Sequence, residues 1–343
     1  MAEFAGPSLS VVIPVYNSAR TLERCLGAVS AQLGHDDELI VVDDGSTDDV
    51  VEVATRFGAT MVRMEGRSGV AAARNRGADR ATRAVLLFLD ADVVPHADTI
   101  ARGRGRFTNS SVDAVIGSYD DKPEAKTLVS QFKNLAHHHF HQRAGGRVGS
   151  FWGGCGFIKR DVFFTAGGFD ESRFSRPSIE DVELGWRVTD GGGQIVLDPE
   201  ILVTHLKQWT LGSLIKTDVL YRAVPWIRWS LERRRLGGEL NASLPQKVAL
   251  LVAVALVASG LAAVSFALAR FLFVVFSGLA FLINAQLFRL FWRKGGARLL
   301  VAGFALQQIY YLCALAGLLI GVARFCWPGR RSVSAPPPAR VGA

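Results

Sequence analysis

Residues 84–94 read Ala-Val-Leu-Leu-Phe-Leu-Asp-Ala-Asp-Val-Val, a continuous apolar run that stops on two carboxylates. Such a run is typical of a buried strand in a parallel sheet. Ligands of open α/β sheets bind outside the carboxyl ends of the strands, so Asp90 and Asp92 lie where a site would form. Two carboxylates this close repel each other unless a cation lies beside them. Their oxygens are ligands of the kind that Mg²⁺ or Mn²⁺ prefers, and such a metal in turn binds a diphosphate. The alternative is a strand that ends in a solvated, Asp-rich turn.

Working outward, apolar β-rich segments alternate with helical patterns, which predicts a mostly parallel, doubly wound α/β sheet. Strands are expected at 9–13, 38–43, 59–63, 84–89, 114–119, 194–198 and 201–205, and helices from Ser18, over 49–57 and 128–141, and after a cap at Ser178.

The segment Gly66–Gly77 combines small residues with the start of an alanine-rich helix. Such a backbone can approach a ligand closely, and a helix N-terminus favours a phosphate. Arg67 and Arg74 could add charge-assisted contacts. Helix–sheet packing explains the glycines and alanines equally well.

The composition excludes some classes of function. The net charge is +8, but the basic clusters 233–235, 293–294 and 330–331 flank apolar segments, which favours an anionic membrane surface over nucleic acid. The four cysteines have no CxxC spacing, so neither a disulfide framework nor a zinc site is indicated. Residues 1–10 lack the basic and apolar regions of a signal peptide, and the N-terminal domain is therefore expected to stay in the cytoplasm.

His137 and His141 would share one face of a helix and invite a metal interpretation. No carboxylate or cysteine lies nearby at ligand spacing, so a polar helix face or the lining of an acceptor path is favoured.

The C-terminal third indicates a multi-pass membrane protein. Segments 248–269, 271–290 and 299–323 are long and apolar enough for three spans. Interleaved aromatics and arginines before them predict amphipathic helices in the membrane interface. The expected domains are a catalytic domain (1–207), interfacial helices (208–246), a transmembrane region (247–325) and a disordered tail (326–343). Core helices of a soluble protein are the alternative.

Five motifs occur in an order that resembles glycosyltransferase family 2, the inverting family with the GT-A fold. They are Val12-Ile13-Pro14-Val15-Tyr16-Asn17, Val42-Asp43-Asp44-Gly45-Ser46, Asp90-Ala91-Asp92, Gly153-Gly154 with Gly167-Gly168-Phe169-Asp170, and Glu180-Asp181.

The resemblance implies roles for these positions. The nucleotide would be held by Pro14, Val15, Tyr16, Asn17, Asp43, Asp44, Arg74 and Asp90. The metal, Mg²⁺ or Mn²⁺, would be held by Asp90, Asp92 and His205, although His205 could equally be an ordinary residue at a strand end.

Asp181 matches the general base of the family, with Glu180 beside it. Inversion requires a carboxylate that deprotonates the acceptor hydroxyl as it attacks opposite the leaving diphosphate. The acceptor would be bordered by Trp152, Gly153, Gly154, Trp186, Arg187 and Trp209.

The expected function is transfer of a single sugar from a nucleotide-sugar, with UDP favoured, to a lipid or lipid-linked acceptor at the cytosolic face of the cell membrane. Lys207-Gln208-Trp209 does not complete the QxxRW motif of processive synthases, and Ser18 replaces the acidic residue that many members carry. A soluble or polysaccharide acceptor, a non-catalytic GT-A scaffold and a nucleotidyltransferase are the alternatives.

Overall fold

The computed structural model of the chain describes residues 6–108, 111–233 and 244–327. The expected tail beyond residue 327 and the basic cluster at 330–331 lie outside the described residues. The strands are β1 (Leu9–Val15), β2 (Glu38–Asp43), β3 (Thr60–Arg63), β4 (Val85–Leu89), β5 (Val93–Pro95), β6 (Ala114–Tyr119), β7 (Gly146–Val148), β8 (Cys155–Lys159) and β9 (Ile195–His205).

The helices of the N-terminal part are α1 (Ala19–Ser30), α2 (Val50–Arg56), α3 (Val70–Arg80), α4 (Thr99–Gly105), the 3₁₀ turn η1 (Arg106–Thr108), α5 (Leu128–Arg143), α6 (Arg160–Thr165) and α7 (Glu180–Asp190). They are followed by α8 (Leu211–Lys216), the π-helix η2 (Thr217–Ala223), α9 (Val224–Glu232), α10 (Leu244–Ala262), α11 (Ala267–Ile283) and α12 (Ala285–Cys326).

Eight strands of one sheet run in the order β3-β2-β1-β4-β8-β6-β9-β5, and β7 pairs with β9. The half formed by β1 to β4 is parallel, as the sequence predicts. The other half is mixed, because β8 runs antiparallel to both β4 and β6, and β5 and β7 run antiparallel to β9. The expected α/β sheet is confirmed, with one parallel half and one mixed half in which β6 and β9 are parallel.

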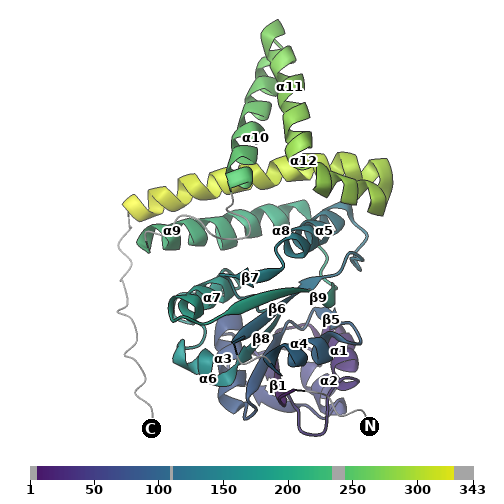
Figure 1. Cartoon of the computed structure of the whole chain (residues 1–343), viewed down its shortest axis with the longest axis vertical. Helices are drawn as coiled ribbons and strands as arrows, with labels where there is room; N and C mark the ends of the chain where they lie inside the picture. The colour runs from purple at the N-terminus through teal and green to yellow at the C-terminus, as the bar shows by residue number, and fades with distance from the viewer. Residues whose placement is uncertain (1–5, 109–110, 234–243, 328–343) are drawn as a thin grey trace.

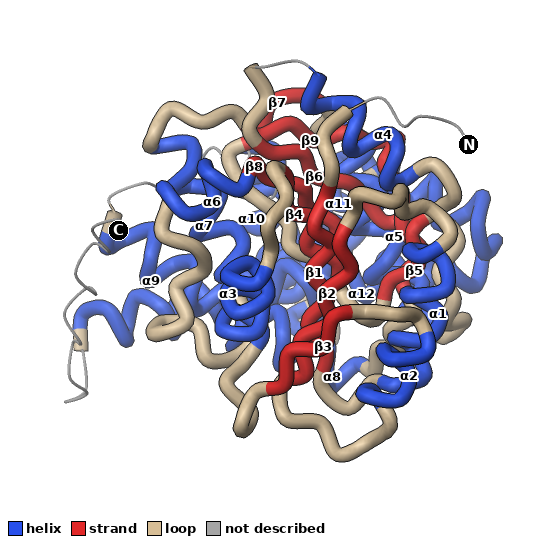
Figure 2. Tube along the Cα trace, turned by 90° about the horizontal axis from the view of Figure 1, so that it is seen from below, coloured by secondary structure: helices blue, strands red, loops and turns tan. Residues whose placement is uncertain are grey.

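Two apolar cores cover the two faces of the sheet. On one face Leu22 of α1, Val53 of α2 and Ile100 of α4 pack against the strands. On the other face the side chains come from α3, α6 and α7. Figure 2 shows the strands as a central band with α1, α2 and α4 on one side and α3, α6 and α7 on the other. Because β1 to β4 are parallel, their carboxyl ends lie at the same edge of the sheet.

A single strand, β9, replaces the two strands expected at 194–198 and 201–205. Its pairing with β6 shifts register between Ile116 and Ser118, so a bulge absorbs the irregularity around Pro199. A Cβ on Gly117 would come within 2.6 Å of the Ile201 carbonyl oxygen, so only glycine fits at this bulge.

The C-terminal helices form a separate layer above the sheet (Figure 1). Helices α8, η2 and α9 follow one another without a break, and α12 runs along them. This contact is close because small residues face it: a Cβ on Gly317 would lie 2.2 Å from Cβ of Ala223. Helices α10 and α11 form a hairpin that projects away from this layer and from the sheet.

Among the described residues, α10 and α12 are long and apolar enough to cross a membrane, with mean hydropathies of 1.8 and 1.9, whereas α11 is shorter. The helix boundaries differ from the expected spans. The turn of the hairpin lies between Ala262 and Ala267, so Arg270 is in the first turn of α11 and not in the connection. The expected loop at 293–298 is a kink inside α12 at Gly296, where φ is +60°.

Candidate active site

A cavity of about 130 Å³ opens where β1 and β2 end, beside the start of α3. It is lined by Pro14, Val15, Tyr16, Asp44, Arg67, Gly69, Val70, Ala73, Ser175 and Pro177. The guanidinium of Arg67 lies 4.2 Å from the centre of the Tyr16 ring, so a cation and an aromatic face meet at its rim. The cavity therefore combines a flat apolar wall, a carboxylate and a positive charge.

Asp44 builds this cavity together with the glycine loop. Its two carboxylate oxygens accept hydrogen bonds from the backbone N–H groups of Ser68 at 2.7 Å and Gly69 at 2.9 Å. A Cβ on Gly69 would lie 2.4 Å from the Ser175 carbonyl oxygen, and φ there is +98°, so the loop requires glycine at this point.

Asp43 and Asn17 shape the neighbouring loops and do not line the cavity. The buried Asp43 carboxylate accepts from the Ser46 N–H at 2.7 Å, and Asn17, with φ of +47°, accepts from the Thr47 N–H at 2.8 Å. Both residues hold these loops in place, and their direct contact with the nucleotide stays a prediction.

Arg74, which the resemblance places at the diphosphate, is buried in the structure between two carboxylates. Its Nη2 donates to Asp90 at 2.8 Å and its Nη1 to Glu180 at 2.9 Å, and only 4% of its side chain is exposed. A Cβ on Gly153 would lie 2.6 Å from its Cζ. Arg74 therefore ties three parts of the site together, and Arg67 is the cation at the cavity.

The predicted metal ligands lie together at the end of β4 and of β9. Oδ2 of Asp92 is 3.7 Å from Nε2 of His205, and the His205 ring stacks on Tyr119 with centroids 4.3 Å apart. Burial raises the pKa of Asp90, and the charge of Asp92 adds to the effect, although Arg74 opposes it. For Asp92, burial is outweighed by the nearby His205 imidazole and by the charge of Lys207, which lower its pKa.

These side chains fit a divalent cation whose coordination is completed by other ligands. Among the described residues, no three His, Cys, Asp or Glu side chains come close enough to make a metal site by themselves. A carboxylate and an imidazole within 3.7 Å, with Asp90 two residues away, would leave positions for water and phosphate oxygens, as Mg²⁺ sites commonly do.

Asp181 lies at the start of α7 with both oxygens held by backbone donors. Oδ2 accepts from Gly153 N–H at 3.1 Å, and Oδ1 accepts from Val182 N–H at 2.8 Å. Burial, assisted by the charge of Glu180, raises the pKa of Asp181 to about 6. A carboxylate with this pKa is suited to general-base chemistry near neutral pH.

Glu180, which the sequence places beside the base, makes contacts within the protein. Its side chain is 5% exposed, and its carboxylate binds Arg74 and accepts from the Ser178 N–H at 2.7 Å. It positions Arg74 and the start of α7.

Of the expected acceptor residues, Trp152, Gly153 and Gly154 border the site. Trp152 is half-buried and packs edge-on against Tyr119, with centroids 5.0 Å apart. Gly153 donates to Asp181, and the Gly154 carbonyl accepts from the Asp90 N–H. His137 and His141 both pack against the ring of Trp152, and Nδ1 of His141 lies 3.0 Å from the Gly117 carbonyl oxygen. The two histidines therefore support the position of the Trp152 side chain.

The other expected acceptor residues, Trp186, Arg187 and Trp209, pack within the protein in this structure. Trp186 is 1% exposed and stacks on Trp229 of α9 at 4.1 Å. Arg187 binds Glu183 and the carbonyls of residues 166 and 168. Trp209 is 5% exposed, and its backbone N–H donates to Ser130 Oγ at 2.7 Å. Aromatic and basic residue types alone do not distinguish a packing role from ligand contact.

Three contributors were missed as site residues. Ser175 and Pro177 come from a loop without regular secondary structure, and no periodic signal marks them. Tyr119 is the last residue of β6, as His205 is the last residue of β9. The position at a strand end, which pointed to His205, could have pointed to Tyr119 as well.

The mixed α/β sheet with its helices resembles the GT-A fold of solved glycosyltransferases. The model of the glycosyl transferase family 2 matches residues 10–164. The match covers 155 of the 343 residues, from β1 to α6, and supports a family 2 glycosyltransferase.

Several curated relatives are glycosyltransferases. Glycosyltransferase AglE of Haloferax volcanii is 29% identical over 235 residues, 66% of this chain and 76% of that protein. The PGL/p-HBAD biosynthesis glycosyltransferase of Mycobacterium tuberculosis is 40% identical over 104 residues, which are 29% of this chain and 41% of that protein. The pre-mycofactocin glycosyltransferase of the same species is 29% identical over 63% of this chain and 47% of its own length.

Two solved structures support the fold. The mannosyltransferase PcManGT from Pyrobaculum calidifontis, in complex with GDP-Man and Mn²⁺, gives a TM-score of 0.56 at 20% identity over 94% of this chain and 88% of that one. GalNAc-T7 with UDP, GalNAc and Mn²⁺ gives 0.51 at 20% identity over 67% of this chain and 48% of that one.

Proposed function

We propose that this protein transfers a single sugar from a nucleoside-diphosphate sugar to a lipid or lipid-linked acceptor, with inversion at the anomeric carbon. The observation that carries the proposal is the meeting of three parts at one edge of the sheet. These are the cavity beside Tyr16 and Asp44, the pair Asp92 and His205, and the carboxylate of Asp181.

In this proposal the nucleoside lies in the cavity, with Tyr16 against its base or sugar and Arg67 near its negative charge. Asp92 and His205, with Asp90, hold a divalent cation, Mg²⁺ or Mn²⁺. When bound, the cation neutralises charge on the leaving diphosphate. Both solved neighbours contain Mn²⁺, one with UDP and one with GDP-Man, so uridine and guanosine donors are the first to test.

Asp181 is the proposed base. Its two backbone hydrogen bonds fix the carboxylate at the rim near Gly153, and it accepts the proton from the acceptor hydroxyl as the new glycosidic bond forms. If the nucleophile is instead a lipid phosphate, it is already ionised, and Asp181 is then not required for proton removal.

The proposed membrane face rests on how the site is joined to the C-terminal layer. Helix α7, which carries Asp181, is fixed to α9 by the stack of Trp186 on Trp229, and Ser178 Oγ donates to the Tyr221 carbonyl of η2 at 2.6 Å. Large apolar side chains are exposed on this layer and on the hairpin: Leu251, Val301 and Leu319 are each more than 60% exposed. We therefore place the hairpin in the bilayer and the catalytic part on the cytoplasmic side.

The test is a transfer assay with purified full-length protein in detergent. Radiolabelled UDP- and GDP-sugars are offered with Mn²⁺ and a membrane lipid extract, and label is measured in the organic phase. Donor-specific, EDTA-sensitive label in the organic phase supports the proposal. Label that stays in water-soluble or polymeric products contradicts the lipid acceptor, and no transfer from any donor contradicts the activity.

A further inference from the structure

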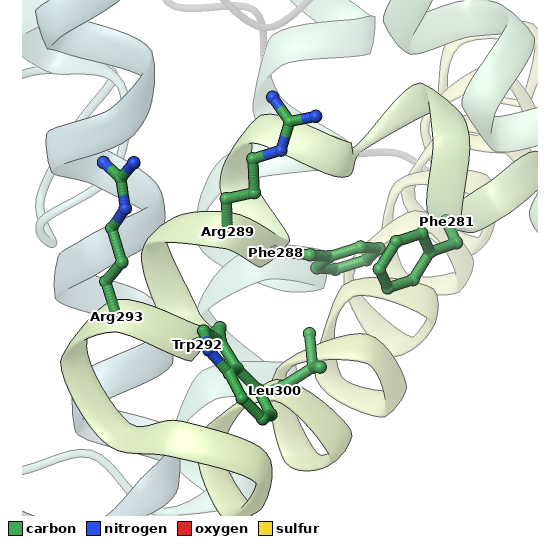
Figure 3. Close-up of a pocket in the computed structure, with 6 residues that line it drawn as sticks. All are labelled: Phe281, Phe288, Arg289, Trp292, Arg293 and Leu300. Atoms are coloured by element: carbon green, nitrogen blue, oxygen red, sulfur yellow. The ribbon is translucent and has the colours of Figure 1, made fainter.

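A second cavity, of about 230 Å³, lies at the elbow where α11 ends and α12 begins, far along the chain from the site residues. It is lined by Phe281, Phe288, Arg289, Trp292, Arg293 and Leu300 (Figure 3). The first segment of α12 and the segment after the Gly296 kink form its walls together with the end of α11. The kink therefore creates the space.

The residues of this cavity divide into two chemical groups. Four supply apolar walls, and Figure 3 shows the Phe281, Phe288, Trp292 and Leu300 side chains gathered on one side. Arg289 and Arg293 are four residues apart and so lie on one helix face, and in Figure 3 both guanidinium groups point away from the rings in the same direction. Both arginines are exposed, and within the described ranges no carboxylate forms an ion pair with either.

The position of the elbow gives this surface an orientation. Lys294, next to Arg293, forms an ion pair with Asp121, which follows β6 in the catalytic part. The other neighbour of the cavity is the foot of the apolar hairpin. The two arginines therefore lie at the level where the catalytic part meets the proposed membrane surface.

We propose that this cavity is a binding site for an anionic membrane phospholipid, whose phosphate is held by Arg289 and Arg293 and whose hydrocarbon chain occupies the apolar space. Two guanidinium groups on one helix face match the bidentate hydrogen bonding of a phosphate. A water-soluble anion would use the arginines and leave the apolar walls exposed to water, whereas a neutral lipid would use the walls and leave the charges unused. The proposal rests on the membrane orientation given above, not on sugar transfer.

Lipid binding can be measured without any sugar donor. Full-length protein in detergent is titrated with dioleoyl phosphatidic acid and, separately, with dioleoylglycerol, which has the same chains and no phosphate. Native mass spectrometry counts bound lipid, and the fluorescence of Trp292, taken as the difference between wild type and Trp292→Phe, reports the cavity. We expect saturable binding of phosphatidic acid at least about tenfold tighter than of dioleoylglycerol, in keeping with charge-assisted hydrogen bonds.

Three variants separate the contributions. R289Q/R293Q should remove the preference for phosphatidic acid, and L300W should weaken binding of both lipids by filling the cavity. R298Q/R324Q removes the same charge from exposed positions of α12 outside the cavity and should change affinity less than about twofold. Three outcomes would overturn the proposal. The two arginine double variants could lose the same affinity for phosphatidic acid, or the wild-type protein could bind the two lipids equally. Alternatively, both L300W and R289Q/R293Q could bind them as the wild type does. None of these outcomes depends on transferase activity.

Discussion

Asp181 and Glu180 are adjacent in the chain, yet their surroundings separate their roles. The carboxylate of Glu180 binds the buried guanidinium of Arg74. The carboxylate of Asp181 accepts hydrogen bonds only from backbone N–H groups, and its side chain is half-buried. The pKa of Asp181 rises to about 6 because burial disfavours its charge. One residue of the pair therefore anchors the site and the other is left for chemistry.

Replacing Asp181 with Asn tests this division. Asn keeps the shape and one acceptor oxygen but has no base, so transfer to a hydroxyl acceptor should fall by about 10²- to 10⁴-fold. Donor affinity, measured by calorimetry with Mn²⁺, should stay within about twofold. The matched control is Glu180→Gln, which should lower the melting temperature because it weakens the anchor of buried Arg74. Full turnover by Asp181→Asn would remove it from the mechanism or identify an ionised acceptor.

The pH dependence follows from the same pKa. Only the deprotonated carboxylate accepts a proton, so kcat/KM should be flat above about pH 7 and fall about tenfold per pH unit below about pH 6. The acid limb should vanish from the residual activity of Asp181→Asn. An acid limb that persists unchanged in the variant would assign it to another group.

At the residue scale, the sequence located the site better than it assigned the contacts. The acidic pairs 43–44, 90–92 and 180–181 follow strands or begin a helix, which sets them at one edge of the sheet. Whether a side chain faces ligand or interior depends on partners far away in the chain. Arg74 is buried because Glu180, 106 residues later, and Asp90 both converge on it, and no local pattern contains that information.

At the scale of elements, the joint between α7 and α9 connects the base to the C-terminal layer. Trp186 stacks on Trp229 with an interplanar angle of 16°, and Trp226 packs edge-on at 5.3 Å. Large aromatic side chains bury much apolar surface, and such pairs add to its effect.

Trp229→Ala should therefore destabilise the protein by about 3–5 kcal/mol, the usual range for an aromatic residue truncated in a core. It should also reduce transfer, because α7 loses its support. Trp327→Ala is the control, since Trp327 is 84% exposed and its loss should barely alter the melting temperature measured by scanning calorimetry. Equal melting temperatures for Trp229→Ala and wild type would contradict the structural role of the joint.

Elements with strong periodicity were predictable and those formed by tertiary pairing were not. The strands from β1 to β4 and helices α1, α2 and α5 lie where apolar runs and helical spacing place them. The short strands β5 and β7 carry three residues each and exist only because β9 pairs with both. Strand direction was also hidden: β8 reads like its parallel neighbours, and its antiparallel pairing depends on the path of the chain before it.

At the scale of the whole molecule, the C-terminal third is a flat layer with a projecting hairpin, whereas the sequence suggested three similar spans. Composition could not distinguish these arrangements, because α12 is as apolar as a span. The difference lies in small residues such as Gly317 and Gly321, which let α12 lie against η2 and α9.

Cysteine labelling distinguishes the two arrangements. Exposed Cys326 at the end of α12 should react with a membrane-impermeant maleimide on the same side as the catalytic part, whereas Val264→Cys, at the 87% exposed turn of the hairpin, should react only from the opposite side. The other cysteines are buried, and Cys326→Ser gives the background. Protection of Cys326 in sealed vesicles with the catalytic part outside would instead support a third crossing.

The most direct test of the central claim is a thermal-shift screen of the detergent-purified protein with UDP-, GDP-, CDP- and dTDP-sugars, each with Mn²⁺ and with EDTA. A ligand at about a hundred times its Kd stabilises the folded state by about 2.7 kcal/mol, which predicts a rise in Tm of several degrees. We predict that rise for one nucleotide class with Mn²⁺, its loss in EDTA, and its loss in Asp92→Ala but not in Asp161→Ala, an exposed carboxylate on α6. No rise with any nucleotide-sugar would contradict the account and leave a GT-A scaffold without donor binding.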